Sequence, residues 1–213
     1  MQFRIPEISD ALSQIDEAMK AGFGWEHGPF ELWDAVGLTA GITLIKEAGH
    51  PVIAAAVILK TPIDGLNDSK KISKNKRELL SSLIMENSFF AFGSASHKEI
   101  DEINIHNASL LAMKRAILNL NFKPNKVLVD GLYLPDVEFK KDAIVGGDAI
   151  ISEISAASII AKVYRDNLML DFDKKYPIYE FYKHKGYPTK LHKEMLKIHG
   201  SCLIHRKSFK GVS

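Results

Sequence analysis

The spacing of apolar and polar positions changes at Pro51. Before that residue, positions 7–20 and 37–48 place apolar side chains at helical intervals, which predicts two short amphipathic helices. After it, the run Val52–Leu59 consists of β-branched residues, alanine and leucine, and such a run is typical of a buried strand. The chain therefore changes from a helical to a strand-forming pattern at this point.

Downstream of the first strand, predicted helices and strands alternate. Ser96 precedes Glu99 by three residues, which is the signature of a capping box at the start of a helix. The pattern predicts helices over residues 73–87, 96–120, 153–172 and 189–199, and strands over residues 88–96, 126–130 and 143–145. This order favours an α/β or α+β layer fold with a mixed sheet over a helical bundle.

Composition limits the class of protein. The 213 residues are 46% hydrophobic and 25% charged, which is typical of a soluble globular chain of one domain, or one domain with an appendage. The longest apolar run is far shorter than the roughly 20 residues that cross a bilayer, so we expect no membrane association. Acidic residues scattered through the first thirty positions argue against a signal peptide. Cys202 is the only cysteine, which fits a reducing, cytoplasmic setting and excludes an intrachain disulfide.

The net charge of +2 hides an uneven distribution. Residues 1–50 contain three basic and eight acidic side chains, a net of −5, and the remaining chain has 25 basic and 18 acidic ones, a net of +7. Residues 183–213 carry eight Lys or Arg against one acid, Glu194. Such a segment is either a solvated surface or a site for a phosphate backbone, and charge alone leaves both interpretations open.

Two aspartates stand beside glycine at predicted strand ends. Asp130 follows the strand over residues 126–130, and Asp148 follows Gly146 and Gly147. One such acid is commonly a turn former or a helix cap. Two of them at neighbouring strand ends would supply the oxygen ligands that Mg²⁺ or Mn²⁺ prefers, and paired ions can stabilise an in-line phosphoryl displacement. With the basic segment, the pair indicates a metal-dependent enzyme that acts on nucleic acid.

Several sequence strings resemble those of the ribonuclease HII family in order and spacing. They are GLNDSKKIS at 65–73, VDG at 129–131, VGGDAIISEISAASIIAKV at 145–163, HKGYPT at 184–189 and HRKSF at 205–209. The resemblance runs from about Pro51 to Phe209. It implies an RNase H-like mixed sheet flanked by helices, with a C-terminal helical basic segment. It also implies hydrolysis of the RNA strand of RNA–DNA hybrids and incision at ribonucleotides embedded in duplex DNA, and we expect a monomer.

The resemblance assigns metal-binding roles to the two aspartates. Asp130 resembles the aspartate at the family's second acidic position, and Asp148 resembles the one that closes the metal site. Mn²⁺ or Mg²⁺ is the implied cofactor. Gly146 departs from the family pattern, which usually has a lysine there.

Other residues match positions that hold the nucleic acid. Tyr187 resembles the tyrosine that stacks on the sugar of the junction ribonucleotide. Asn67, Ser69 and Lys70 resemble a loop that holds the nucleic-acid backbone. For Lys162 and Arg165, on the predicted long helix, a phosphate contact and a solvated surface charge are equally good interpretations.

The first acidic motif of the family is missing. Family members have Asp-Glu-Ala-Gly-Arg-Gly at the end of their first strand, whereas this chain reads Ile-Lys-Glu-Ala-Gly-His-Pro over residues 45–51. In one alignment, Glu47 is a remaining catalytic and metal-binding carboxylate, and Lys46 replaces the aspartate before it. In the other, Ala40-Gly41-Ile42 precedes the motif, and Thr43 and Leu44 occupy the acidic positions. Neither alignment restores the full set of carboxylates.

The preceding residues resemble a different family. The string IDEAMKAGFGWEHGPFELWDAVG over residues 15–37 is similar to the helical C-terminal region of 3-hydroxyacyl-CoA dehydrogenases, and the similarity continues through residues 45–50. This similarity favours a helical position for Glu47 over a metal ligand. Gly22-Phe-Gly24 lacks the preceding strand and glycine spacing of a dinucleotide-binding motif.

We therefore expect a chimera of a helical head over residues 1–50 and a ribonuclease HII-like domain over residues 51–213. Three functional hypotheses follow. The first is an active metal-dependent endoribonuclease, and the second is a catalytically impaired protein that binds RNA–DNA hybrids. The third is an acyl-CoA-related role inherited from the head. Whether the head supplies a substitute first strand is open.

Overall fold

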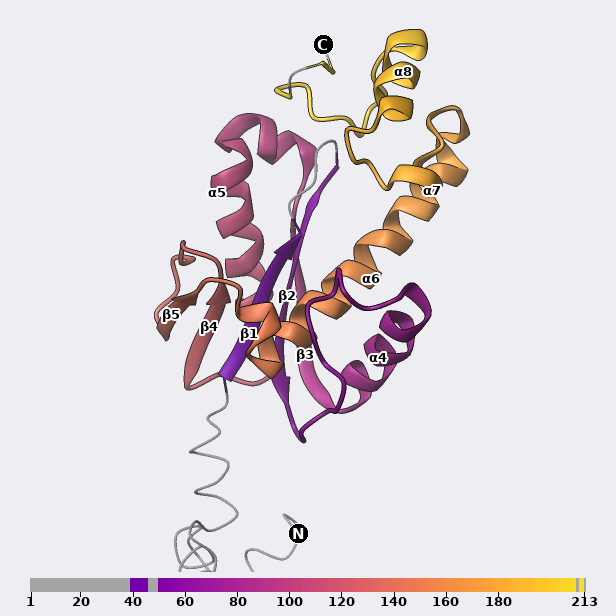
Figure 1. The fold of residues 1–213 in the computed structure, drawn as a ribbon. Coiled ribbons are helices and arrows are strands. Elements are labelled where there is room, and N and C mark those ends of the chain that lie inside the picture. Colours follow the sequence, from indigo (N-terminus) through magenta and orange to yellow (C-terminus); the bar gives the residue numbers. More distant parts are fainter. Residues whose placement is uncertain (1–38, 46–49, 210, 213) are drawn as a thin grey trace, which may run out of the picture.

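A computed structural model describes residues 39–45, 50–209 and 211–212. Its centre is a five-stranded mixed sheet with the order β3-β2-β1-β4-β5 (Figure 1). The strands are β1 (Thr39–Ile45), β2 (Val52–Leu59), β3 (Ser88–Ala95), β4 (Lys126–Asp130) and β5 (Lys140–Ile144). The three strands β1, β2 and β3 are antiparallel neighbours, whereas β4 runs parallel to both β1 and β5. The expected mixed sheet with flanking helices is confirmed.

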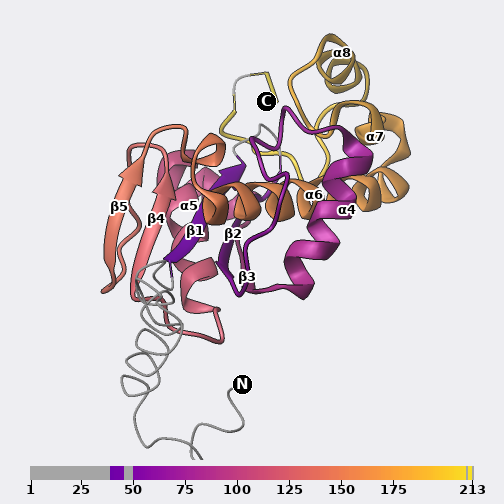
Figure 2. The same cartoon turned by 60° about the horizontal axis from the view of Figure 1, so that its bottom comes forward.

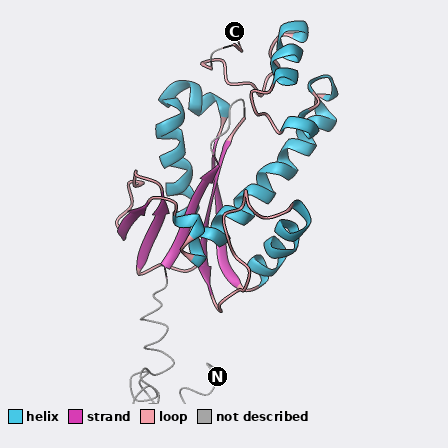
Figure 3. Ribbon diagram, viewed as in Figure 1, coloured by secondary structure: helices cyan, strands magenta, loops and turns pink. Residues whose placement is uncertain are grey.

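Helices cover both faces of the sheet. They are α4 (Lys74–Glu86), α5 (His97–Leu118), α6 (Ser152–Lys175), α7 (Phe181–His184) and α8 (Lys190–His199), with 3₁₀ turns η2 (Gly147–Ala149) and η3 (Pro177–Tyr179). Figure 2 shows α6 and α4 together on one face and α5 on the other. The mainly helical segment after α6 lies beyond one end of the sheet (Figure 3). Among the described residues, none of these helices combines the length and apolar character needed to span a membrane.

The core follows from the alternation of side chains along β2. Val52, Ala54 and Ala56 point into a cluster with α5, while Ile53 and Ala55 point into a cluster with α4 and α6. A strand that is buried on both faces must be apolar at every position, as the run Val52–Leu59 is. The expected buried strand is confirmed.

The predicted capping box also forms. Ser96 Oγ accepts a hydrogen bond from the backbone N–H of Glu99, and Glu99 Oε2 accepts one from the backbone N–H of Ser96 at 2.9 Å. Arg115 donates to Glu99 Oε1 at 2.7 Å, and this bond is the main reason why the pKa of Glu99 falls to about 2. These contacts fix the start of α5 relative to its last turn.

The helix predicted over residues 37–48 is wrong, because Thr39–Ile45 forms strand β1. It pairs with β2 on one side and with β4 on the other, at the centre of the sheet. Two strands with free hydrogen-bonding edges stabilise an extended backbone between them more than amphipathic spacing stabilises a short isolated helix. The end of the segment 1–50 thus contributes a strand to the sheet, while the helical head itself lies outside the described residues and stays a prediction.

Candidate active site

Asp130 and Asp148 come from adjacent elements at one edge of the sheet. Asp130 is the last residue of β4 and pairs in register with Ile144, the last residue of β5. The chain then turns through Gly146, whose φ of 69° suits glycine, into the 3₁₀ turn that carries Asp148. The backbone N–H of Gly147 donates to Asp130 Oδ1 at 3.0 Å. This bond links the two strand ends directly and orients the Asp130 carboxylate.

Gly147 is buried at this junction. A Cβ at this position would lie 2.6 Å from Cδ1 of Ile154, in the first turn of α6. The close approach keeps η2 against α6, and the glycine amide can therefore reach Asp130.

The electrostatic environment of Asp148 shows which charges gather here. Burial raises the pKa of Asp148 above its usual range, and the negative charges of Asp130 and Asp68 raise it further, while Lys70 acts in the opposite direction. The predicted pair is therefore accompanied by a third carboxylate, Asp68. Carboxylates whose mutual repulsion disfavours ionisation are well suited to bind a cation.

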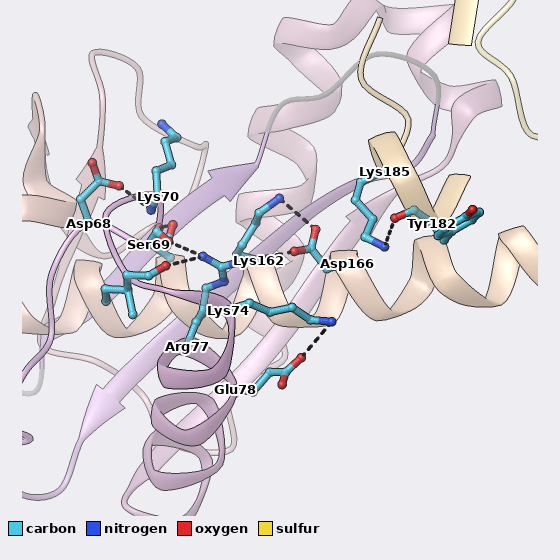
Figure 4. A network of polar contacts seen from close by, with 12 residues as sticks. Asp68, Ser69, Lys70, Lys74, Arg77, Glu78, Lys162, Asp166, Tyr182 and Lys185 are labelled. Atoms are coloured by element: carbon cyan, nitrogen blue, oxygen red, sulfur yellow. Dashed lines mark hydrogen bonds and ion pairs between the residues drawn. The ribbon is translucent and has the colours of Figure 1, made fainter. Parts of the chain in front are cut away.

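The loop over residues 65–73 is clamped to two helices. Ser69 Oγ shares a buried hydrogen bond of 2.8 Å with Ser158 Oγ, and Ser155 Oγ donates to the carbonyl of Asn67 at 2.9 Å. From α4, Arg77 Nη1 donates to the carbonyl of Ser69 at 2.6 Å (Figure 4). The Ser69 hydroxyl thus holds the loop in place, and the side chains of Asn67 and Lys70 are exposed.

Tyr187 projects from the turn between α7 and α8. Its side chain is partly open to solvent, and its backbone N–H donates to the carbonyl of His184 at 2.8 Å. Lys162 Nζ lies 5.4 Å from the centre of its ring, within range of a cation–π interaction. Lys162 is partly buried and also donates to Asp166 Oδ1 at 2.9 Å. Lys162 is therefore a support for Tyr187 within the structure.

Arg165 is placed differently from both of its expected surface roles. Its side chain is 1% exposed, and Nη1 donates to the carbonyl of Lys185 at 3.0 Å. An arginine at this position of α6 faces the segment that follows the helix, so it supports the chain just before Tyr187. A direct phosphate contact and a solvated charge are both incompatible with this burial.

The sheet register shows where the missing acidic motif would lie. The parallel pairing of β1 with β4 ends at Ile42 and Val129, so the next residues in register are Thr43 and Asp130. The backbone thus favours the alignment that puts Thr43 at the first acidic position. Glu47 lies outside the described residues.

Comparisons with known proteins agree with this architecture. The family model for ribonuclease HII matches residues 47–212. A ribonuclease HII of Borrelia recurrentis is 56% identical over 164 residues, which covers 75% of this chain and 91% of the relative. The chain belongs to the ribonuclease HII family. Residues 9–71 also match the C-terminal domain of 3-hydroxyacyl-CoA dehydrogenase, as the sequence of the head predicts.

Solved structures place the same fold in ribonucleases H2 and HIII. The ribonuclease H2 of Pyrococcus horikoshii superposes with a TM-score of 0.70 at 25% identity, and the match covers 82% of this chain and 94% of that one. Bst-RNase HIII in complex with Mn²⁺ gives a TM-score of 0.66 at 13% identity, covering 84% of this chain and 70% of that one. The second likeness concerns the fold alone.

The donor set of this ribonuclease HII chain fits a hard divalent cation. Asp130 and Asp148 offer carboxylate oxygens, and Mg²⁺ commonly binds through one or two carboxylates while water and substrate phosphates complete its shell. Among the residues that the structure describes, no three His, Cys, Asp or Glu side chains converge closely enough to enclose an ion. Two carboxylates fit an ion that takes its other ligands from water or phosphate oxygens.

Sequence reasoning missed three residues that contact or surround the candidate site. Asp68 lies within the GLNDSKKIS string but resembles a turn residue, because its Oδ1 accepts the backbone N–H of Lys70 at 2.9 Å. Asp166 is four residues after Lys162, a spacing that predicts a helical ion pair. Arg77 carries no such signal, since its partners depend on how α4 packs against the loop.

Proposed function

We propose that this chain is a metal-dependent endoribonuclease of the HII type, with Mn²⁺ or Mg²⁺ as its cofactor. Its substrates are RNA–DNA hybrids, in which it hydrolyses the RNA strand, and duplex DNA that contains embedded ribonucleotides. The observation that carries the proposal is the junction of Asp130 and Asp148, which a hydrogen bond from Gly147 fixes at one edge of the sheet. Membership of the family supplies the substrate class.

Each part of the site has a task in this reaction. A bound cation would activate water and stabilise charge on the scissile phosphate. Asp130 and Asp148 would hold the cation, and one oxygen of Asp130 already accepts a hydrogen bond from the Gly147 amide. The Tyr187 side chain is 40% exposed, and the sugar of the junction ribonucleotide stacks on its ring. The exposed Lys70 and Asn67 contact the nucleic-acid backbone.

A second candidate function rests on Thr43. The β1–β4 register, continued by one residue, supports a position beside Asp130 for this residue rather than for a carboxylate. With fewer carboxylates, the site would hold cations weakly, and the protein would bind hybrids through Tyr187 and the basic C-terminal segment but hydrolyse them poorly.

A cleavage assay separates the two functions. A labelled duplex with one ribonucleotide, incubated with Mn²⁺ or Mg²⁺, should be cut on the 5′ side of the ribonucleotide to leave a 3′-hydroxyl, and chelation by EDTA should stop the reaction. Asp130→Asn and Asp148→Asn should each lower the rate at least about a hundredfold, because each removes a charge that would hold the cation. Rates are measured on denaturing gels.

Asp142→Asn is the matched control. Asp142 is an exposed aspartate on the neighbouring strand β5, where it pairs with Lys126 at 2.5 Å. The Asp142→Asn variant should cut the duplex at the wild-type rate. Undiminished cleavage by Asp130→Asn would contradict the metal-site assignment, and a gel shift without cleavage in the wild type would favour the impaired binding protein.

A further inference from the structure

The carboxylate of Asp166 lies between two cations that come from different elements. Asp166 Oδ1 accepts a hydrogen bond from Lys162 Nζ at 2.9 Å, one turn earlier on α6. Its Oδ2 lies 3.9 Å from Nη2 of Arg77, which belongs to α4. Figure 4 shows the three side chains meeting between the two helices. Their side chains are only 12 to 18% exposed, so water screens these charges much less than it screens a surface pair.

Arg77 connects this carboxylate to the loop over residues 65–73. Its Nη1 donates to the carbonyl of Ser69 at 2.6 Å and to that of Ile72 at 2.9 Å. A guanidinium that holds two loop carbonyls and faces a carboxylate has a single well-defined orientation. The position of the loop therefore depends on the charge at Asp166.

Lys162 connects the same carboxylate to Tyr187. Its ammonium lies 5.4 Å from the centre of the tyrosine ring while it donates to Asp166. The backbone of Tyr187 is fixed separately, since the carbonyl of Tyr187 accepts the N–H of Thr189 at 2.7 Å. The ion pair thus selects the lysine rotamer that supports the ring.

The charge of Asp166 also affects the pKa of a further cation, Lys185. Burial lowers the pKa of Lys185, and the charge of Asp166 opposes that shift, while Lys74 and Lys162 reinforce it. Asp166 is therefore the carboxylate that directly faces Lys162 and Arg77, and its removal would leave these two cations without it.

We propose that Asp166 is a positioning residue that couples the two substrate-holding elements, the loop over residues 65–73 and Tyr187, through Arg77 and Lys162. This inference rests on the proposed function for the roles of those elements, but the coupling itself is a property of the protein without substrate. Asp166 touches no reacting atom. It acts by keeping the loop and the tyrosine ring in one relative arrangement.

The first test needs no substrate. Tyrosine-ring signals are recorded by NMR in ring-labelled protein, and Tyr187→Phe identifies the Tyr187 signal. Asp166→Asn keeps the size of the side chain but removes its charge, so it should shift the Tyr187 ring signal and the Ser69 amide signal together. Lys162→Met should shift the ring signal alone, because Arg77 keeps its carboxylate partner.

Asp171→Asn is the matched control on the same helix. Asp171 pairs with Lys174 at 2.9 Å, but both side chains are largely exposed, and neither contacts Tyr187 or the loop in the described structure. It should leave both signals in place. If Asp166 supports neither element, Asp166→Asn will match Asp171→Asn, and that result overturns the proposal. Asp166→Glu, which restores the charge, should return the loop signal toward its wild-type position.

The second test measures binding by fluorescence anisotropy, using a duplex with one ribonucleotide and an all-DNA duplex of the same sequence. Asp166→Asn should weaken binding of the ribonucleotide duplex by about tenfold, the loss expected for one charge-assisted hydrogen bond, with a smaller effect on the all-DNA duplex. Lys162→Met combined with Asp166→Asn should weaken it little further, because both changes break the same link.

The two tests fail separately. Shifted NMR signals in a protein that does not distinguish the two duplexes would refute the proposed substrate and leave the coupling in place. Unshifted signals in a protein that does distinguish them would refute the role of Asp166 and leave the proposed function standing.

Discussion

The buried ring of His50 packs among aromatic rings and near the cations Arg165 and Arg206. The side chain is fully buried, it packs against the rings of Phe172 and Phe181, and neither ring nitrogen has a hydrogen-bond partner among the described residues. Its carbonyl, by contrast, accepts a hydrogen bond from Arg206 Nε at 2.7 Å, and this bond involves no atom of the His50 side chain. Burial of the two unpaired ring nitrogens therefore costs folding free energy, whereas the backbone carbonyl of His50 is hydrogen-bonded.

Replacing His50 by leucine should stabilise the protein. His50→Leu keeps the carbonyl that Arg206 binds and removes two unpaired polar atoms, so the free energy of unfolding should rise by about 1 kcal/mol. Urea denaturation at pH 7.5 measures the change. His50→Gln, which keeps an unpaired polar group, should give no gain. A lower urea midpoint for His50→Leu than for the wild type would show that the ring contacts outweigh the unpaired nitrogens.

Residues could be placed from the sequence where a local signal fixes their position, and not where a partner distant in sequence does. Asp130, Asp148 and Tyr187 stand next to glycine at strand ends or in turns, and these local signals persist in the fold. Arg165 has no local signal that separates a surface cation from a buried one. Its burial is set by the carbonyl of Lys185, twenty residues later, which sequence spacing does not place.

Among the elements, β1 shows most clearly how tertiary pairing overrides a local pattern. Most strands and helices after Pro51 could be predicted because their own side chains alternate or repeat in step with the final structure. The exception is β5 (Lys140–Ile144), whose polar residues gave no such pattern and which begins three residues before the strand predicted over residues 143–145. Residues 37–48 have an amphipathic spacing, yet Thr39–Ile45 is extended between β2 and β4. This conformation is determined by hydrogen bonding to β2 and β4. Both strands follow β1 in the sequence but flank it in the sheet.

The position of β1 beside β4 predicts that a substitution in β1 can raise the rate of cleavage. Thr43 follows Ile42, the last residue paired with β4, so Thr43→Asp would put a carboxylate in register beside Asp130. A further ligand should strengthen cation binding and raise the rate of cleavage by at least about tenfold, which corresponds to about 1.4 kcal/mol of additional transition-state stabilisation. Denaturing gels measure the rate on the duplex with one ribonucleotide.

Thr43→Asn, similar in size to aspartate but uncharged, is the control. The added charge should also make the midpoint of thermal unfolding depend on Mn²⁺ concentration, since a ligand that binds the folded state stabilises it by mass action. If Thr43→Asp and Thr43→Asn have the same rate and the same response to Mn²⁺, the register does not bring position 43 to the proposed metal site.

At the scale of the whole molecule, three buried histidines pack together in the segment that follows α6. His184, His192 and His205 are each at most 5% exposed, and His192 Nε2 lies 3.1 Å from His205 Nε2. Burial is the main cause that lowers the pKa of all three, to about 4 for His192 and for His205. The segment that carries Tyr187 is therefore packed around imidazoles that must stay neutral.

This packing should make the protein sensitive to mild acid. Above about pH 6.5 these rings are neutral in both the folded and the unfolded chain, and the stability is fully present. As the pH falls below 6.5, the unfolded chain takes up protons that the folded chain refuses until about pH 4, so each such histidine removes up to about 1.4 kcal/mol of stability per pH unit. Urea midpoints at pH 7.5 and 5.5 should therefore differ markedly.

Carboxylates do not account for a loss in that interval. The pKa of Glu99 is lowered to about 2, so its contribution disappears only at more acidic pH, and the raised pKa of Asp148 changes stability in the opposite sense. His199→Gln, which replaces an exposed ring on α8, should keep the wild-type difference between the two midpoints. His192→Gln, which cannot be protonated, should reduce that difference. Equal midpoints for the wild type at pH 7.5 and 5.5 would mean that the buried rings accept protons in the folded protein, contrary to their packing.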